Sequence, residues 1–141
     1  MASETVDVVR GQFEAFERGG LDAVTKFWHP DIEWRAVEGA ADDVGVIRGH
    51  TALRRYYQDW IDMFHDLRAE VTEVISETGE RVAVVVSNSG FGRGSNVRTM
   101  GRYYAVCTVR DGQIVSGREY DTREGAVEAF ELLVRNDSGV S

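Results

Sequence analysis

Cysteine and long apolar runs are scarce in this sequence, and each shortage excludes a class of protein. The only cysteine is Cys107, so no intramolecular disulfide can form. Its apolar, strand-like setting predicts a small buried core residue in a reducing compartment. No stretch approaches the roughly 20 apolar residues of a membrane-spanning helix, and the first residues lack the basic start and apolar run of a signal peptide. We therefore expect a cytoplasmic protein with no membrane partner.

Basic residues are also outnumbered by acidic ones. The chain has 16 lysines and arginines against 24 acidic residues, which gives a net charge of -8. Because no basic field is available to hold phosphates, we expect no nucleic acid partner. No spacing of His, Cys, Asp and Glu resembles a metal site, and we expect neither a metal nor a cofactor. The expected partner is a small neutral or cationic molecule, or another protein.

Hydrophobic residues make up 43% of the chain, which is enough to bury the core of one domain over 1–141. Apolar residues at helical spacing predict four helices, over 4–19, 21–28, 51–64 and 122–134. Alternating or β-rich segments predict five strands, over 31–37, 67–76, 81–91, 98–110 and 113–121. The segment 38–49 has no periodicity and carries acids and glycines, which predicts a loop that could cover something.

This order of elements predicts an α+β protein. Helices would pack on one face of a curved, mostly antiparallel sheet and form a cone with an inside. Where the layers do not meet fully, the inside is a pocket. Several large aromatic side chains fall on the segments that would surround it, and we expect them to line an apolar binding site: Phe16, Trp28, Trp34, Tyr57, Trp60 and Tyr103.

Three segments resemble the nuclear-transport-factor-2-like (NTF2-like) superfamily, in its SnoaL-like and ketosteroid-isomerase-like branch. They are "FEAFERGGLDAVTKFWHPDIEWRA", "IRGHTALRRYYQDWIDMF" and "VCTVRDGQIVSGREYDTREGAVEAF". The resemblance covers nearly the whole chain and implies a cone-shaped α+β barrel that forms a homodimer through the open face of its sheet. It also implies a range of functions, because the same fold hosts ketosteroid isomerases, epoxide hydrolases, polyketide cyclases and dehydratases.

The segment "GREYDTREG" supplies the candidate catalytic acids, Glu119 and Asp121, which point to the same side of a strand. It partly resembles the final-strand "W-R-D-Y-F-D" segment of limonene-type epoxide hydrolases, and that resemblance puts Glu119 at the acid position. Asp121 lies three residues before Glu124 and an apolar-periodic segment, which predicts that Asp121 is the N-cap of the last helix. Glu119 is therefore the first catalytic candidate and Asp121 the second. In the alternative interpretation, Glu119 pairs with an arginine across the sheet.

The sequence thus predicts a pocket for a small hydrophobic molecule. If the protein is an enzyme, its reaction would be cofactor-free proton transfer, as in an isomerase, cyclase, dehydratase or hydrolase, with Tyr57 or Tyr103 as hydrogen-bond donors. The alternative is a non-catalytic dimeric module that binds a ligand unchanged or mediates an interaction. A third alternative, binding of phenylalanine-glycine repeats, has only the fold in its support.

Overall fold

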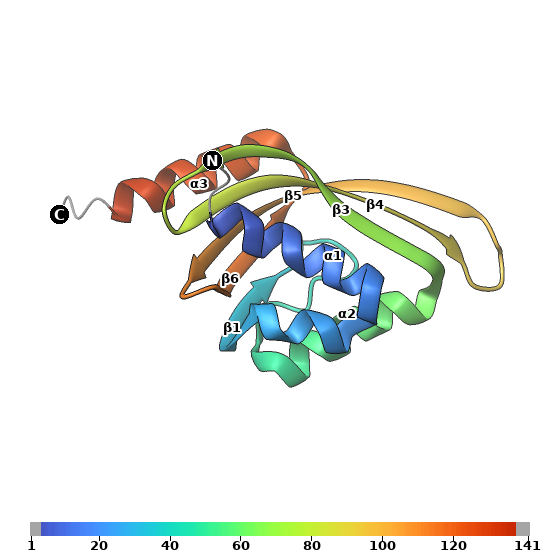
Figure 1. The fold of residues 1–141 in the computed structure, drawn as a ribbon. Coiled ribbons are helices and arrows are strands. Elements are labelled where there is room, and N and C mark those ends of the chain that lie inside the picture. Colours follow the sequence, from blue (N-terminus) through green and yellow to red (C-terminus); the bar gives the residue numbers. More distant parts are fainter. Residues whose placement is uncertain (1–3, 138–141) are drawn as a thin grey trace.

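The computed structural model describes residues 4–137 and contains three α-helices and one six-stranded sheet (Figure 1). The helices are α1 (Glu4–Val24), α2 (Gly49–Met63) and α3 (Arg123–Asp137), and a short 3-10 turn, η1 (Thr25–Phe27), follows α1. The strands are β1 (Trp28–Arg35), β2 (Ile47–Arg48), β3 (Phe64–Glu77), β4 (Arg81–Gly92), β5 (Arg98–Arg110) and β6 (Gln113–Tyr120). The predicted α+β class is confirmed. None of the described helices is long and apolar enough to span a membrane.

The strands follow the order β2-β1-β6-β5-β4-β3, and the sheet does not close on itself. β1 and β6 run parallel, and the other neighbouring pairs run antiparallel. Two registers position the site: Trp34 of β1 lies beside Gly117 of β6, and Ala105 of β5 lies beside Glu119. β6 is thus an inner strand, held on both sides.

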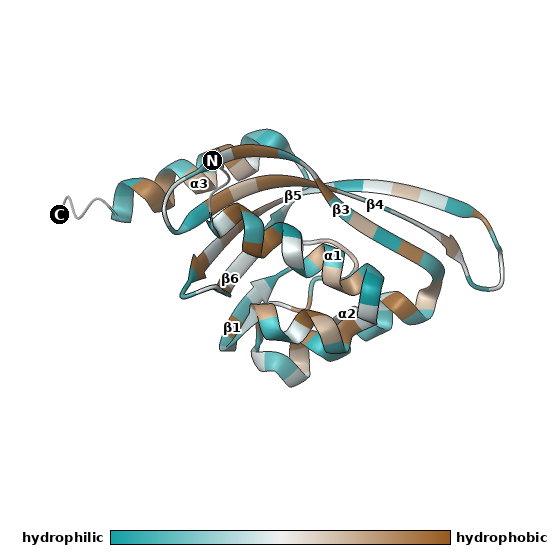
Figure 2. Ribbon diagram, in the orientation of Figure 1, coloured by the Kyte–Doolittle hydropathy of each residue, from teal (hydrophilic) through white to brown (hydrophobic). Residues whose placement is uncertain are grey.

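The sheet is covered on both faces, and this differs from the expected packing of all helices on one face. In β4 and β5, Val82, Val84 and Cys107 belong to the large core under α1, whereas Ala83 and Val106 pack with α3 on the other side. Figure 1 accordingly shows α3 across the sheet from α1 and α2. Burial of alternate residues on opposite faces explains why β4 contains an unbroken run of apolar residues over 82–86. The strands become more polar toward the β4–β5 hairpin (Figure 2).

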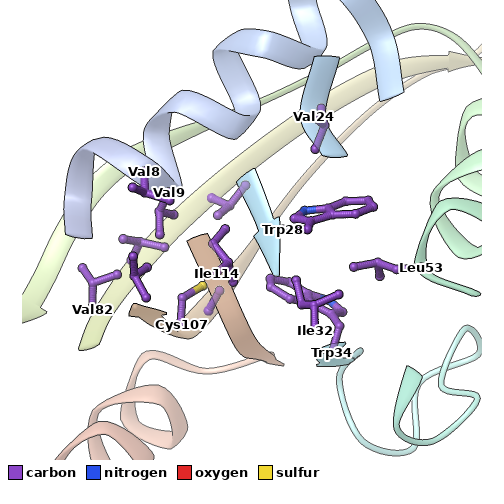
Figure 3. Packing of buried hydrophobic residues seen from close by; sticks show 14 of the residues in the cluster. Val8, Val9, Val24, Trp28, Ile32, Trp34, Leu53, Val82, Cys107 and Ile114 are labelled. Carbon is purple, nitrogen blue, oxygen red and sulfur yellow. The ribbon is translucent and has the colours of Figure 1, made fainter. Parts of the chain in front are cut away.

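The first two predicted helices are merged in the structure. α1 continues to Val24, with a break at Gly20, whose φ of 66° is favoured by glycine. Trp28 was expected to end a helix but begins β1, where it is extended and paired with Ile114 of β6. Its side chain is buried between Val24 of α1 and residues of β1 (Figure 3). Pairing and burial of Trp28 therefore override the local helical spacing.

The predicted 38–49 loop largely holds, with one correction. Ile47 and Arg48 form the short strand β2 at the sheet edge, paired with Trp34 and Glu33 of β1. Gly49 begins α2, and residues 38–46 are irregular and pass beside that helix. Ile47 is 6% exposed, so burial of one apolar side chain accompanies this short pairing.

Candidate functional site

A cavity of about 270 Å³ lies between α1, α2 and the inner face of the sheet. Five of the six predicted aromatic residues line it: Phe16, Trp28, Tyr57, Trp60 and Tyr103. The sixth, Trp34, is buried behind the wall instead of lining it. Apolar side chains such as Phe13 and Leu21 fill most of the remaining wall. The cavity thus offers an aromatic, largely apolar site to a small molecule.

Glu119 projects into this cavity from β6. Its side chain is on the same face of the strand as that of Gly117 would be, because side chains alternate along a strand. The residue is only 9% exposed, and one carboxyl oxygen, Oε2, accepts a hydrogen bond of 2.8 Å from the indole Nε1–H of Trp34. The arginine pairing considered as an alternative is absent: among the described residues, no arginine forms an ion pair with Glu119.

Burial raises the pKa of Glu119 from an ordinary 4.5 to about 7. The hydrogen bond from Trp34 opposes this shift, and repulsion by Asp42 adds to it. A carboxyl group with a pKa near 7 gains and loses its proton readily at neutral pH, which is the property that a general acid or base needs.

Trp34 reaches Glu119 because residue 117 is a glycine. A Cβ atom added to Gly117 would lie 2.1 Å from Cζ3 of the Trp34 ring and 2.4 Å from its Cε3. Real Cβ atoms do not approach carbon so closely, so any side chain at this position would displace the indole. The glycine is therefore a positioning element for the bond between Trp34 and Glu119.

Asp42 is a second carboxyl group in the cavity wall, and the sequence did not single it out. It lies in the loop between β1 and β2. Its Oδ2 atom accepts hydrogen bonds from the Tyr56 hydroxyl at 2.5 Å and from Nε1–H of Trp60 at 3.2 Å, both on α2. The only sequence signal was the acidic, aperiodic loop itself, which indicated a cover but not which acid turns inward.

The neighbouring acid, Asp43, holds this loop to the sheet. Its carboxylate accepts from the Arg35 guanidinium at 3.1 Å and from the backbone N–H groups of Gly39 and Gly45. The Arg35 hydrogen bond and these backbone bonds hold the pKa of Asp43 well below its usual range. The two neighbouring acids thus have different roles. Asp42 faces the cavity, and Asp43 holds the loop to the sheet.

Two tyrosines present free hydroxyl groups to the cavity. Tyr57 and Tyr103 both line it, and neither hydroxyl has a hydrogen-bond partner within residues 4–137. Burial raises the pKa of both phenols well above the ordinary value, so they stay protonated and can donate to a ligand.

Asp121 lies outside the cavity and is exposed at the start of α3. The predicted N-cap is wrong by one residue. Thr122 performs this role, because its Oγ1 accepts from the backbone N–H of Gly125 at 3.0 Å. Threonine and aspartate both carry a side-chain oxygen that can accept the N-cap hydrogen bond, and the sequence pattern did not distinguish the two.

No cluster of three His, Cys, Asp or Glu side chains that could hold a metal ion occurs among residues 4–137. His50 donates a hydrogen bond from Nε2–H to the Trp28 carbonyl oxygen, and His65 donates from Nε2–H to Oδ1 of Asn96 near the hairpin. Neither histidine lines the cavity.

The fold and its acid-bearing cavity define an NTF2-like α+β protein. Residues 9–117 match the SnoaL-like domain, and the chain belongs to this family. The comparison with curated proteins gave no match.

Solved structures share the fold. An NTF2-like protein from Burkholderia xenovorans is 27% identical, with 92% of this chain and 98% of that chain covered and a TM-score of 0.65. RV0760c from Mycobacterium tuberculosis, solved with estradiol-17beta-hemisuccinate, is 14% identical over 87% of this chain and 97% of its own, with a TM-score of 0.74. A putative polyketide cyclase from Xanthomonas campestris is 21% identical over 89% and 95%, with a TM-score of 0.68.

The close contact at Gly117 generates a first prediction. Gly117→Ala should destabilise the protein by about 1–3 kcal/mol, because the new methyl group overlaps the Trp34 ring. Gly79→Ala is the matched control, since nothing lies within 4 Å of its added Cβ. Urea unfolding of both variants checks this, and equal stabilities for the two would contradict the proposed packing.

The raised pKa of Glu119 predicts a pH-dependent stability. The folded state holds the proton more tightly than the unfolded state, so the stabilising contribution is complete below about pH 4.5 and is lost as the pH rises through about 7. Relative to Glu119→Gln, the free energy of unfolding of the wild type should fall by up to about 3 kcal/mol over this range. Urea unfolding of both proteins at about pH 5 and about pH 8 measures the difference. If the difference in free energy of unfolding between the two proteins does not change with pH, burial does not raise the pKa of Glu119.

Proposed function

We propose that the protein binds a small hydrophobic molecule in this cavity and transfers a proton to or from it through Glu119, without a cofactor. The observation that carries the proposal is a carboxyl group only 9% exposed, in an aromatic cavity, with a pKa of about 7. Such a group is populated both as acid and as base at neutral pH.

The hydrogen bonds around Glu119 give each of its oxygens a separate role. Trp34 occupies Oε2, and no described residue bonds Oε1, which leaves that atom for the ligand. In the ionised form, Oε1 can accept a proton from an acidic C–H or O–H group, and in the protonated form the carboxyl can return it. The Tyr57 and Tyr103 hydroxyls can stabilise the oxygen on which negative charge develops.

Two structural relatives support a hydrophobic ligand. RV0760c was solved with an estradiol derivative, and the Xanthomonas campestris protein is described as a putative polyketide cyclase. We infer a ligand of similar hydrophobic character for this chain, because its own cavity wall is largely aromatic and aliphatic.

Proton transfer can be tested without knowing the natural substrate. β-Tetralone is a bicyclic ketone with acidic C–H groups beside its carbonyl, and their exchange in deuterated buffer is measurable by proton NMR. The wild-type protein should accelerate this exchange, and Glu119→Gln should remove about a hundredfold or more of the acceleration. Glu128→Gln, on the exposed side of α3, is the control and should leave the rate unchanged.

Two results would contradict this assignment. Equal rates for the wild type and Glu119→Gln would remove Glu119 from the reaction. Binding of the ketone, detected by calorimetry, without any acceleration by the wild type would favour the non-catalytic binding module.

We also propose that the protein forms a homodimer through the outer face of the sheet. Met100 of β5 is 75% exposed, and it lies an even number of residues from Tyr104 and Val106, which pack with α3 on that face. The NTF2-like resemblance implies a dimer through the sheet, and Met100 is an exposed apolar side chain on this face with which the interface can be tested.

Light scattering during size-exclusion chromatography tests the dimer. The wild type should have the mass of two chains, and Met100→Lys should shift it toward one, because the lysine places charge in the interface. Val44→Lys, also at an exposed apolar side chain but in the loop after β1, should stay dimeric. A monomeric wild type, or a dimeric Met100→Lys, would contradict this interface.

A further inference from the structure

We propose that the ligand of this cavity carries a protonated amine, which binds between the carboxyl groups of Glu119 and Asp42 while its hydrophobic body contacts the aromatic wall. This inference rests on the proposed function because it assumes that the same cavity is the binding site. It adds the charge and the hydrogen-bonding chemistry of the ligand.

The charge of the cavity wall is the first support. Glu119 and Asp42 both contribute to the wall, while no Lys, Arg or His side chain does so among the residues that the structure describes. A carboxylate ligand would therefore meet two acids and no counter-charge, at a substantial desolvation cost. An ammonium ligand would meet opposite charge on two sides and would relieve the repulsion between the two acids.

Free hydrogen-bond acceptors are the second support. Each acid uses one oxygen for protein donors: Oε2 of Glu119 accepts from Trp34, and Oδ2 of Asp42 accepts from Tyr56 and Trp60. Oε1 of Glu119 and Oδ1 of Asp42 accept from no residue within 4–137. An alkylammonium group carries three N–H donors, which is enough to donate to both of these oxygens from one ligand group.

Aromatic faces are the third support. Trp28 and Tyr57 stack with ring centroids 5.9 Å apart, and both line the cavity together with Trp60 and Tyr103. The negative face of an aromatic ring attracts a cation, most strongly for tryptophan and in a site shielded from water. The combination of carboxylates and aromatic rings favours a lipophilic amine over a neutral molecule of the same shape.

A matched set of three probes tests the proposal. Naphthylmethylamine, naphthylmethanol and naphthoic acid share one bicyclic ring and differ in charge, being cationic, neutral and anionic at about pH 8, where Glu119 is mostly ionised. Calorimetric titration should show that the amine binds about tenfold or more tighter than the alcohol. It should also show that the acid binds more weakly than the alcohol.

Conservative variants locate the selectivity. Glu119→Gln and Asp42→Asn keep a hydrogen-bond acceptor but remove a charge, and each should weaken binding of the amine more than binding of the alcohol, which reduces the ratio of the two affinities. Glu128→Gln, which removes one exposed acid on α3, should retain the full ratio. Circular dichroism of each variant confirms that it is folded.

The outcomes separate this proposal from the function on which it rests. Binding of the alcohol as tightly as the amine, or tightest binding of the acid, would overturn the amine and leave the hydrophobic pocket standing. A ratio that Glu119→Gln and Asp42→Asn leave unchanged would also overturn it, since the preference would then arise elsewhere. Failure of all three probes to bind the folded wild type would overturn the pocket and the amine together.

Discussion

The hydrogen bond from Trp34 to Glu119 connects the architecture of this protein to its candidate chemistry. It forms only because β1 and β6 run parallel in a register that puts Trp34 beside Gly117, and because that glycine leaves room for the indole ring. The bond orients a carboxyl group that burial would otherwise leave without a donor. It also determines which carboxyl oxygen remains for a ligand. The geometry of the reactive group therefore depends on the strand pairing and on the glycine.

The sheet carries a separate hydrophobic core on each face. On the outer face, Ala83 and Val106 pack against Ala126 and Phe130 of α3, and this layer supports β4 and β5 from behind. On the inner face, the cavity lies beneath α1 and α2, whose aromatic rings form much of the wall. The cavity adjoins the larger core on this face, which shares Val24, Trp28 and Tyr56 with the cavity wall.

Periodicity along the chain predicted most elements of the fold, and strand alternation placed Glu119 on one face of its strand without deciding whether that face lines a pocket. Three features needed tertiary information. The pattern in α3 indicates one buried side but not which face of the sheet it meets. Trp28 has the spacing of a helical residue and is extended because β6 pairs with it. Asp42 and Asp43 are adjacent acids in an aperiodic loop, and only the positions of Arg35 and α2 decide which one enters the cavity.

The two acids of the cavity differ in how the protein surrounds them, and this difference governs what a ligand must supply. Glu119 receives one donor in a deeply buried setting, so its charge is costly unless a further donor or a cation arrives. Asp42 receives two donors from α2 and belongs to a loop that Asp43 ties to the sheet. A ligand that reaches both therefore meets one acceptor held by the scaffold and one acid whose protonation responds to it. Binding of the proposed amine would favour the ionised form of Glu119, so near neutral pH it would release a proton.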